Sequence, residues 1–473
     1  MSLSSKAKFI ALFGLMQGAI INGAAANSTT IVQPITLEQA VELAQQNDPW
    51  LHSNTLQQQA LEQQSVAAGT LPDPTVSLSL MNMPTDSWDF GQEGMTQLKV
   101  GVTQKFVRGD SLAIKQQQLA IESSKFPLLR ENRQAMVKRT VAELWLDAYL
   151  AQQTVALIEA DRTLFLQMAE IATANYANVI GNTKQQDVIR AQLELIQLDD
   201  RLTVEQQKLE TALARLHEWL YVYDVNTASP TFDFDKQVTL SAVDSTLPVV
   251  VLNRPSLLNQ NNYSRNALAQ ELATHPAVLA IDVQQQAKQQ AVLLAKQQYK
   301  PQWAVNASYG YRDNTPAGDD RADLFSLGVS FDVPLFTANK QDKTVAASVA
   351  ESEAVKTEKL LLIKQMISAV EAEVKQLHRL SERQALYQQQ LLTQTHDHAE
   401  ATLTAYTNDN GNFVDVVRAR ISELNARISA LQIDVNALKT VARINYFLPQ
   451  PGNTEANADE RVSTVSAQNL GEH

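Results

Sequence analysis

The sequence predicts an α+β membrane protein in which long helices alternate with β-hairpins, and three observations lead to this prediction. One long stretch of the chain occurs twice. Four short segments alternate between apolar and polar residues, as β-strands with two different faces do. The segments between them repeat apolar residues at intervals of three and four positions, as amphipathic helices do.

The duplicated stretch covers residues 49–102 and recurs, at one constant offset and without a gap, as residues 276–329. A Gln-Gln-Gln-Ala segment occurs at residues 57–60 and again at 284–287. In the same way, Pro74 aligns with Pro301, and the Gly-Val pair at 101–102 aligns with that at 328–329. Such a series at one offset indicates an internal two-fold repeat. We therefore expect a first repeat over residues 27–224, a connector over residues 225–262 and a second repeat over residues 263–448.

The composition argues against several classes of function. The chain has 473 residues, 19% charged residues, a formal net charge of −12 and no cysteine. A negative charge disfavours nucleic acid as the main partner, because phosphate binding needs a basic face. Without cysteine there are no disulfides, Cys-based metal sites or thiol catalysis, and no lipid on an N-terminal cysteine. No Ser-His-Asp, metal-ligand or phosphate-loop constellation is present either, so we expect neither an enzyme nor a bound cofactor.

The first residues are typical of an export signal. Lys6 and Lys8 precede a mostly apolar run over residues 9–21, and Ala24, Ala25 and Ala26 provide a small-residue cleavage pattern. The alternative is a membrane anchor helix, but the run is shorter than the roughly 20 residues that a span needs. We expect residues 1–26 to be a cleaved signal peptide. The polar tail over residues 449–473 is expected to be disordered.

Two hairpins are predicted, over residues 74–106 and 301–334. In the first, Val76, Leu78 and Leu80 alternate with polar residues, and the other three strands follow the same pattern. Strands of about ten residues with one apolar and one polar face are typical of transmembrane β-barrels. A soluble two-faced sheet has the same alternation, but the export signal and the paired hairpins favour a membrane sheet.

Four strands are too few to close a barrel, because the smallest closed membrane barrels have about eight strands and every edge in lipid must be paired. We therefore expect several chains to share one barrel, and three copies would supply twelve strands. The long helices also require neighbours to cover their apolar stripes. Helices are expected over residues 36–71 with a break before Pro49, and then over residues 111–179, 187–220, 267–299 and 339–407. Their Ala, Gln and Ser content favours a hollow helical barrel over an ordinary coiled coil, which would not explain the hairpins.

The layout resembles the outer-membrane efflux protein family over nearly all of the mature chain. The resemblance rests on the repeated unit and on three local marks, which are residues 327–336 and the two helix turns at residues 181–192 and 411–420. It implies a homotrimer with one twelve-stranded barrel in the outer membrane and a long α-helical barrel in the periplasm. It also implies that the helical barrel docks onto a periplasmic adaptor protein and an inner-membrane transporter to form a continuous exit duct.

The resemblance also suggests which residues form the periplasmic entrance. Gly181 and Gly411 would lie near the adaptor contact, and Asp187 and Asp415 near the closed entrance. Threefold symmetry would gather these carboxylates, which would favour cations. Carboxylates are also favoured at helix starts without any such role.

The position three residues after each aspartate departs from the family's best-known pattern, in which a second acidic residue follows the counterpart of Asp415. Here Arg190 and Arg418 occupy these positions. The chain therefore does not reproduce the acidic double ring of that pattern. An Asp–Arg network between neighbouring helices is an alternative way to hold the mouth shut.

The cargo is less well defined. Residues 95–110 resemble the metal-cation branch of the family more than the drug branch. His396 and His398 form the densest histidine cluster, but side chains two positions apart on a helix point away from each other, which favours a solvated face. Met81 and Met83 could be soft ligands, although packing is the simpler interpretation.

A periplasmic adaptor protein is the chief alternative for the whole chain. Adaptors also have helical hairpins, but they lack this duplication and these amphipathic strand pairs.

Overall fold

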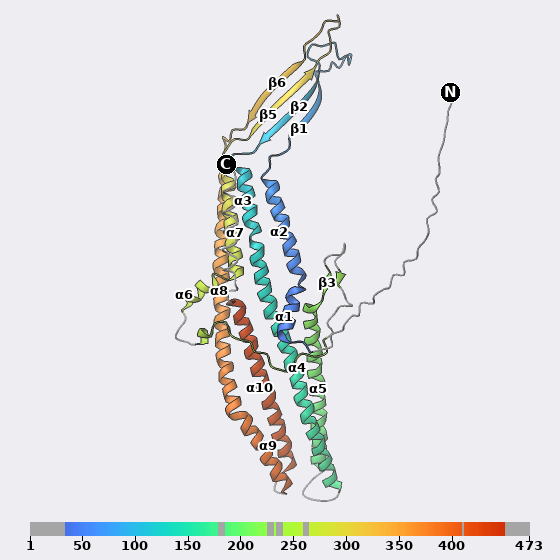
Figure 1. The fold of residues 1–473 in the computed structure, drawn as a ribbon, viewed down its shortest axis with the longest axis vertical. Helices are drawn as coiled ribbons and strands as arrows, with labels where there is room; N and C mark the ends of the chain where they lie inside the picture. The colour runs from blue at the N-terminus through green and yellow to red at the C-terminus, as the bar shows by residue number, and fades with distance from the viewer. Residues whose placement is uncertain are drawn as a thin grey trace, which may run out of the picture.

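The computed structural model describes residues 34–177, 185–224, 231–232, 240–258, 264–408 and 411–449. The molecule is strongly elongated, with a β-sheet at one end and two pairs of long helices reaching the other end (Figure 1). The expected signal peptide, residues 450–473 of the expected tail and the turn at Gly181 lie outside the described residues. No helix in the described part of the chain is both long and apolar enough to cross a membrane.

The two repeats contain the same succession of elements. The first consists of α1 (Leu37–Gln46), α2 (Pro49–Ala68), β1 (Thr75–Met81), β2 (Gln97–Phe106), α3 (Ser111–Ser123), α4 (Lys125–Ala177) and α5 (Gln185–Leu220). The second consists of α6 (Arg265–Leu272), α7 (Pro276–Gln297), β5 (Trp303–Tyr311), β6 (Leu324–Phe331), α8 (Gln341–Leu386), a π-helical turn (Tyr387–Leu391), α9 (Leu392–Thr407) and α10 (Phe413–Phe447). Between them lie β3 (Tyr223–Asp224), β4 (Thr231–Phe232) and a short 3₁₀ helix (Pro255–Leu258).

Three helices that were expected to be continuous are interrupted. The helix expected over residues 267–299 breaks before Pro276, as its counterpart does before Pro49, because proline is favoured at the first helical position. The helix expected from Ser111 divides at Ser124, since Pro127 has no N–H to bond the Ser123 carbonyl. The helix expected over residues 339–407 contains the π-helical turn, and its path bends on the way to α9 (Figure 1).

The four predicted strands form one antiparallel sheet with the order β1-β2-β5-β6. Each hairpin pairs its own strands, and β2 pairs with β5 to join the two repeats. The mostly helical fold with four antiparallel strands confirms the predicted combination of long helices and two β-hairpins.

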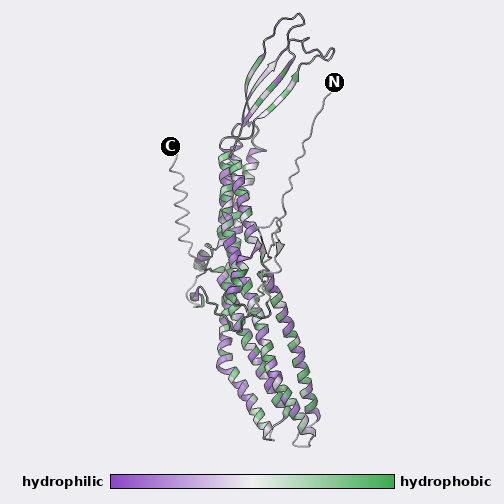
Figure 2. Ribbon diagram, turned by 45° about the vertical axis from the view of Figure 1, so that its right-hand side comes forward, coloured by the Kyte–Doolittle hydropathy of each residue, from purple (hydrophilic) through white to green (hydrophobic). Residues whose placement is uncertain are grey.

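Buried apolar side chains form three clusters along the helices, and Figure 2 shows apolar and polar residues alternating around every long helix. In the middle of the molecule, Trp145 on α4 is fully buried and stacks on Tyr149 with ring centroids 5.6 Å apart. The indole N–H of Trp145 donates to the Ile35 carbonyl at 2.9 Å, which holds the start of the described chain against α4. A separate cluster near the far end joins α4, α5 and α10 through Ile158, Leu198 and Leu424.

Candidate functional site

The sheet has one apolar and one polar face, and the strand register shows that each face is continuous across all four strands. Leu78 pairs with Val100, Val100 with Tyr309, and Tyr309 with Phe325, so these four side chains form one row on one face. The row is exposed, and 71% of the Leu78 surface and 72% of the Phe325 surface are accessible. One position along each strand, the opposite face carries Ser77, Gly101, Ser308 and Ser326. The alternation predicted from the sequence therefore produces two chemically different surfaces.

Aromatic side chains lie at both ends of the apolar face. At the end next to the helices, Trp303 packs on Phe331 with ring centroids 4.7 Å apart, and Phe106 pairs with Trp303 across the strands. At the other end lie Tyr309 and Tyr311, and both residues are about half exposed. Aromatic rows on both sides of an apolar band are the arrangement that membrane barrels place at the two lipid–water boundaries.

The helix-proximal ends of the two hairpins are joined by polar contacts. Arg108 donates to the Lys300 carbonyl at 2.7 Å and forms an ion pair with Asp332. Asp332 also accepts a hydrogen bond from the Gln302 backbone N–H at 2.6 Å. Asp332 belongs to the 327–336 mark on which the family resemblance rests, so this mark contributes to fixing one hairpin against the other.

The loops at the opposite end of the hairpins are joined as well. Arg312 in the second loop donates to the Gly94 carbonyl at 3.1 Å, and Arg321 donates to the Gly91 carbonyl at 3.2 Å. Met81 ends β1 and Met83 lies in the first loop. Within the described residues, no group of three or more His, Cys, Asp or Glu side chains could hold a metal ion.

The far end of the helices carries the residues that were expected at the periplasmic entrance. Asp187 lies in the first turn of α5 and is 4% exposed, whereas Arg190 on the same helix is exposed. Asp415 lies in the first turn of α10, and Arg418 donates to it at 3.0 Å within that helix. The arginine three positions on thus pairs with the aspartate of its own helix.

The Asp415–Arg418 contact does not by itself link neighbouring helices. The N-terminus of α10 is capped by Asn412, whose side chain accepts a hydrogen bond from the Val414 N–H at 3.2 Å. Asn412 therefore caps this helix, and Asp415 contributes only the favourable interaction of a carboxylate with the first turn of a helix.

A side chain at Gly411 would collide with the backbone of α9. A Cβ atom on Gly411 would lie 2.6 Å from the Tyr406 backbone N and 2.8 Å from the Ala405 carbonyl carbon. Both of these atoms belong to the backbone of α9, so only glycine fits this turn without a shift of the chain.

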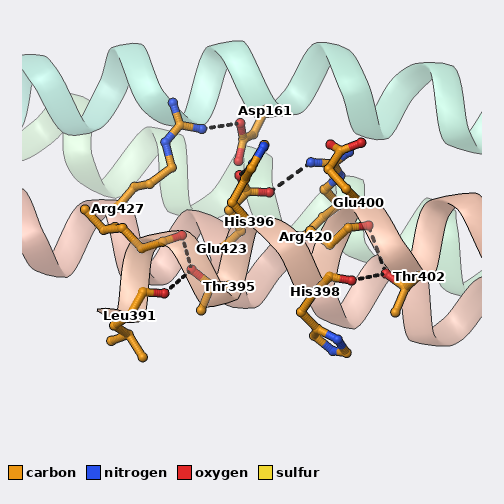
Figure 3. A network of polar contacts seen from close by, with 12 residues as sticks. Asp161, Leu391, Thr395, His396, His398, Glu400, Thr402, Arg420, Glu423 and Arg427 are labelled. Atoms are coloured by element: carbon orange, nitrogen blue, oxygen red, sulfur yellow. Dashed lines mark hydrogen bonds and ion pairs between the residues drawn. The ribbon is translucent and has the colours of Figure 1, made fainter. Parts of the chain in front are cut away.

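A polar network that the sequence analysis did not identify ties α9 to α10 above this turn (Figure 3). His396 Nδ1 lies 2.8 Å from Glu423 Oε1, and Arg420 donates to the other oxygen of Glu423 at 2.9 Å and to Glu400 at 2.6 Å. Arg427 on α10 donates at 3.3 Å to Asp161 on α4, which extends the contacts to a third helix. The only hint in the sequence is the Arg420–Glu423 spacing, which cannot reveal a partner on another helix.

The charges in this network are set by burial and by its hydrogen bonds. Burial disfavours the charged form of Glu423, but the bonds from His396 and Arg420 outweigh it and lower the pKa of this carboxyl. The hydrogen bond to Glu423 raises the pKa of His396. Burial also raises the pKa of Asp161, and Arg427 opposes that shift.

His396 and His398 do not converge on a common ligand. His396 faces Glu423, whereas the His398 ring points away from it and is exposed (Figure 3). The expectation that the two rings point apart is thus confirmed.

Comparisons with known proteins identify the fold. No protein-family model and no curated protein sequence matches the chain. Among solved structures, the chain is similar to the Campylobacter jejuni CmeC outer membrane channel, with 12% identity, a TM-score of 0.69, and 90% of this chain and 88% of that chain covered. It is also similar to the Vibrio cholerae outer membrane protein VceC, with 15% identity, a TM-score of 0.66, and 87% and 95% covered. The open-state Neisseria gonorrhoeae MtrE outer membrane channel gives 12% identity, a TM-score of 0.63, and 87% and 88% covered. The chain has the fold of outer-membrane channels, which confirms the family resemblance at the level of the fold.

Proposed function

We propose that the chain is the outer-membrane exit duct of a tripartite efflux pump and works as a homotrimer. The observation that carries this proposal is the sheet. One of its faces is apolar apart from Gln104, and within the described residues the outer edges of β1 and β6 have no partner. Open edges are not tolerated in lipid, so β1 of one copy would pair with β6 of the next. Three copies give a twelve-stranded barrel with the apolar face toward lipid and the polar face toward a water-filled lumen.

The fold comparisons support the same proposal, because the similar structures are described as outer membrane channels. For the units of the chain we propose the boundaries that the repeat and the export-signal pattern predict. Residues 1–26 form the export signal, residues 27–224 and 263–448 the two repeats, residues 225–262 the connector and residues 449–473 the tail. The helices would then extend into the periplasm as a continuation of the barrel.

The far helix ends are the proposed entrance, where the duct would meet a periplasmic adaptor protein and an inner-membrane transporter. Gly181 and Gly411 would lie at the adaptor contact, and Asp187, Arg190, Asp415 and Arg418 around the opening. Identifying partners that co-purify with the detergent-extracted chain by mass spectrometry tests this part of the proposal. Recovery of an adaptor and a transporter is expected, and recovery of the chain alone from cross-linked membranes would contradict it.

A heavy-metal cargo remains a prediction from the sequence resemblance alone, and we propose neither a resident metal site nor a catalytic activity. A periplasmic adaptor is the less favoured alternative. Its sheet would be packed in a compact domain, whereas here an apolar face with aromatic residues at both ends lies exposed.

Cysteine substitution along β1 tests the orientation of the sheet, because the natural chain has no cysteine. In reconstituted membranes, a water-soluble thiol reagent should modify Ser77→Cys and Ser79→Cys but not Leu78→Cys or Leu80→Cys. Uniform modification at all four positions would indicate a sheet surrounded by water and would contradict the membrane barrel. Conductance steps of the wild-type protein in planar bilayers would add direct support for a duct.

A further inference from the structure

The polar face of the sheet carries charge of one sign only. The four strands contain two charged residues, Lys99 and Lys105 on β2, and no carboxylate. Both lysines share the face of Gly101, because side chains two positions apart on a strand lie on the same side. That is the face opposite Leu78 and Val100.

The surroundings of Lys99 leave its charge uncompensated. Its neighbours across the strands are Ser79 on β1 and Gly310 on β5, and its neighbours on the same face of β2 are Gln97 and Gly101. All four are uncharged. Within the described residues, the Lys99 ammonium group has no hydrogen bond or ion pair, although other lysines near the sheet are paired, such as Lys300 with Asp110 at 2.9 Å.

The neighbours of Lys99 across the strands are small. Ser79 has only a short side chain, and Gly310 has no Cβ, so the uncharged amide of Gln97 lies over Gly310. The long Lys99 side chain extends on the polar side of the sheet, toward the space above that face. In a barrel built from three chains, this space is the lumen.

We propose that Lys99 sets the charge preference of the barrel lumen, where three copies form a basic ring that favours anionic solutes and disfavours cations. The inference rests on the proposed function, since only a closed barrel turns the polar face into a pore wall. Rings of Lys or Arg give anion preference in pores in the same way that carboxylate rings give cation preference. The barrel would thus oppose the cation preference that Asp187 and Asp415 would give at the entrance, and Lys105 would add a second positive position toward the helices.

The preference can be measured locally, without depending on whether the entrance is open. Ser79→Cys places the only thiol of the chain beside Lys99. The thiol is modified with two methanethiosulfonate reagents, an anionic one that carries a sulfonate and a cationic one that carries a trimethylammonium group. Each modification rate is divided by the rate of the same reagent with a free thiol in solution, which removes the difference in intrinsic reactivity. With Lys99 present, the anionic reagent should react relatively faster. Lys99→Gln should lower the anionic-to-cationic ratio by about fivefold, because a unit charge a few ångströms away acts with opposite sign on the two reagents.

Controls separate this inference from the function on which it rests. Lys99→Arg should retain the ratio, and Lys288→Gln on α7, away from the sheet, should not change it. The role of Lys99 is contradicted if the thiol of Ser79→Cys reacts but Lys99→Gln leaves the ratio unchanged. It is also contradicted if the ratio favours the cationic reagent while Lys99 is present. Neither result contradicts the proposed duct. If the thiol of Ser79→Cys is inert while that of Leu78→Cys reacts, the proposed barrel orientation fails, and the inference fails with it.

Discussion

Asp48 and His275 occupy equivalent positions in the two repeats, and each caps the helix that leads to a β-hairpin. The offset that aligns Pro49 with Pro276 also aligns these two residues. Asp48 accepts from the Trp50 N–H at 3.0 Å, and His275 Nδ1 accepts from the Ala277 N–H at 3.2 Å. Both side chains are buried. The duplicated chain therefore fills one structural position with a charged group in one copy and an imidazole in the other.

Asp48 is expected to be important for stability because it combines capping with a buried ion pair. Arg133 on α4 donates to both Asp48 oxygens, at 2.7 and 3.3 Å. Asp48→Ala should lower the free energy of unfolding by about 3 kcal/mol, because it leaves the positive charge of Arg133 without its partner. Asp48→Asn keeps the cap and should cost about 1 kcal/mol less than alanine. Denaturant unfolding in detergent measures both variants.

An exposed ion pair provides the control for this prediction. Glu353 pairs with Lys356 at 2.6 Å on the surface of α8. Glu353→Ala should change stability by less than about 1 kcal/mol. An equal effect of the Asp48 and Glu353 substitutions would contradict the role assigned to the buried pair.

His275 should make the protein less stable as the pH falls. Burial lowers the pKa of His275 below its ordinary value of 6.5, and its Nε2, 3.1 Å from the Tyr446 carbonyl, is placed to donate as a neutral ring does. A lowered histidine pKa means that its stabilising contribution is complete above the unfolded pKa and is lost as the pH drops below it. His275→Asn, which can still cap α7, should therefore lose less thermal stability than wild type between about pH 7.5 and about pH 5. If the melting temperatures of the two proteins fell in parallel as the pH decreased, this prediction would be contradicted.

His396 should have the opposite pH dependence. The hydrogen bond to Glu423, with the charges of Glu423 and Glu400, raises the pKa of His396 above 6.5. Its contribution is therefore complete below the unfolded pKa and is lost as the pH rises through the folded pKa. His396→Gln should be less stable than wild type near about pH 6 and equal to it near about pH 9. Thermal unfolding at the two pH values measures the difference, and His398→Gln, on the side of α9 away from the network, should show none.

Gly411 is expected to be irreplaceable for a steric reason. Alanine there would place its Cβ 2.6 Å from the Tyr406 backbone N, which cannot move like the end of a side chain. Gly411→Ala should destabilise the protein by about 2 kcal/mol and increase protease cleavage near the α9–α10 turn. Gly94→Ala, which meets no atom within 4 Å, is the matched control. Unchanged cleavage in Gly411→Ala would contradict the steric account.

The strands and most helices were predictable because their patterns are local. Leu78 and Ser79 reveal two faces by alternation alone, and Pro49 marks a helix start in either repeat. The break before Pro276 was nevertheless missed, although the aligned Pro49 had been recognised as a helix start. The π-helical turn at Tyr387 and the contact between His396 and Glu423 were not predictable, because both depend on how α8, α9 and α10 pack together.

The central claim, that three chains close one barrel through β1 and β6, is tested most directly by disulfide formation between these two strands. Within one chain, β1 and β6 are separated by β2 and β5, hence by about 14 Å, which is too far for an intrachain disulfide. A panel of double variants, each with one cysteine in residues 75–81 and one in residues 324–331, samples the unknown register between chains. After oxidation in membranes, at least one variant should migrate in denaturing gels as a covalently closed trimer. Monomers throughout the panel, or an open ladder of larger oligomers, would contradict the account.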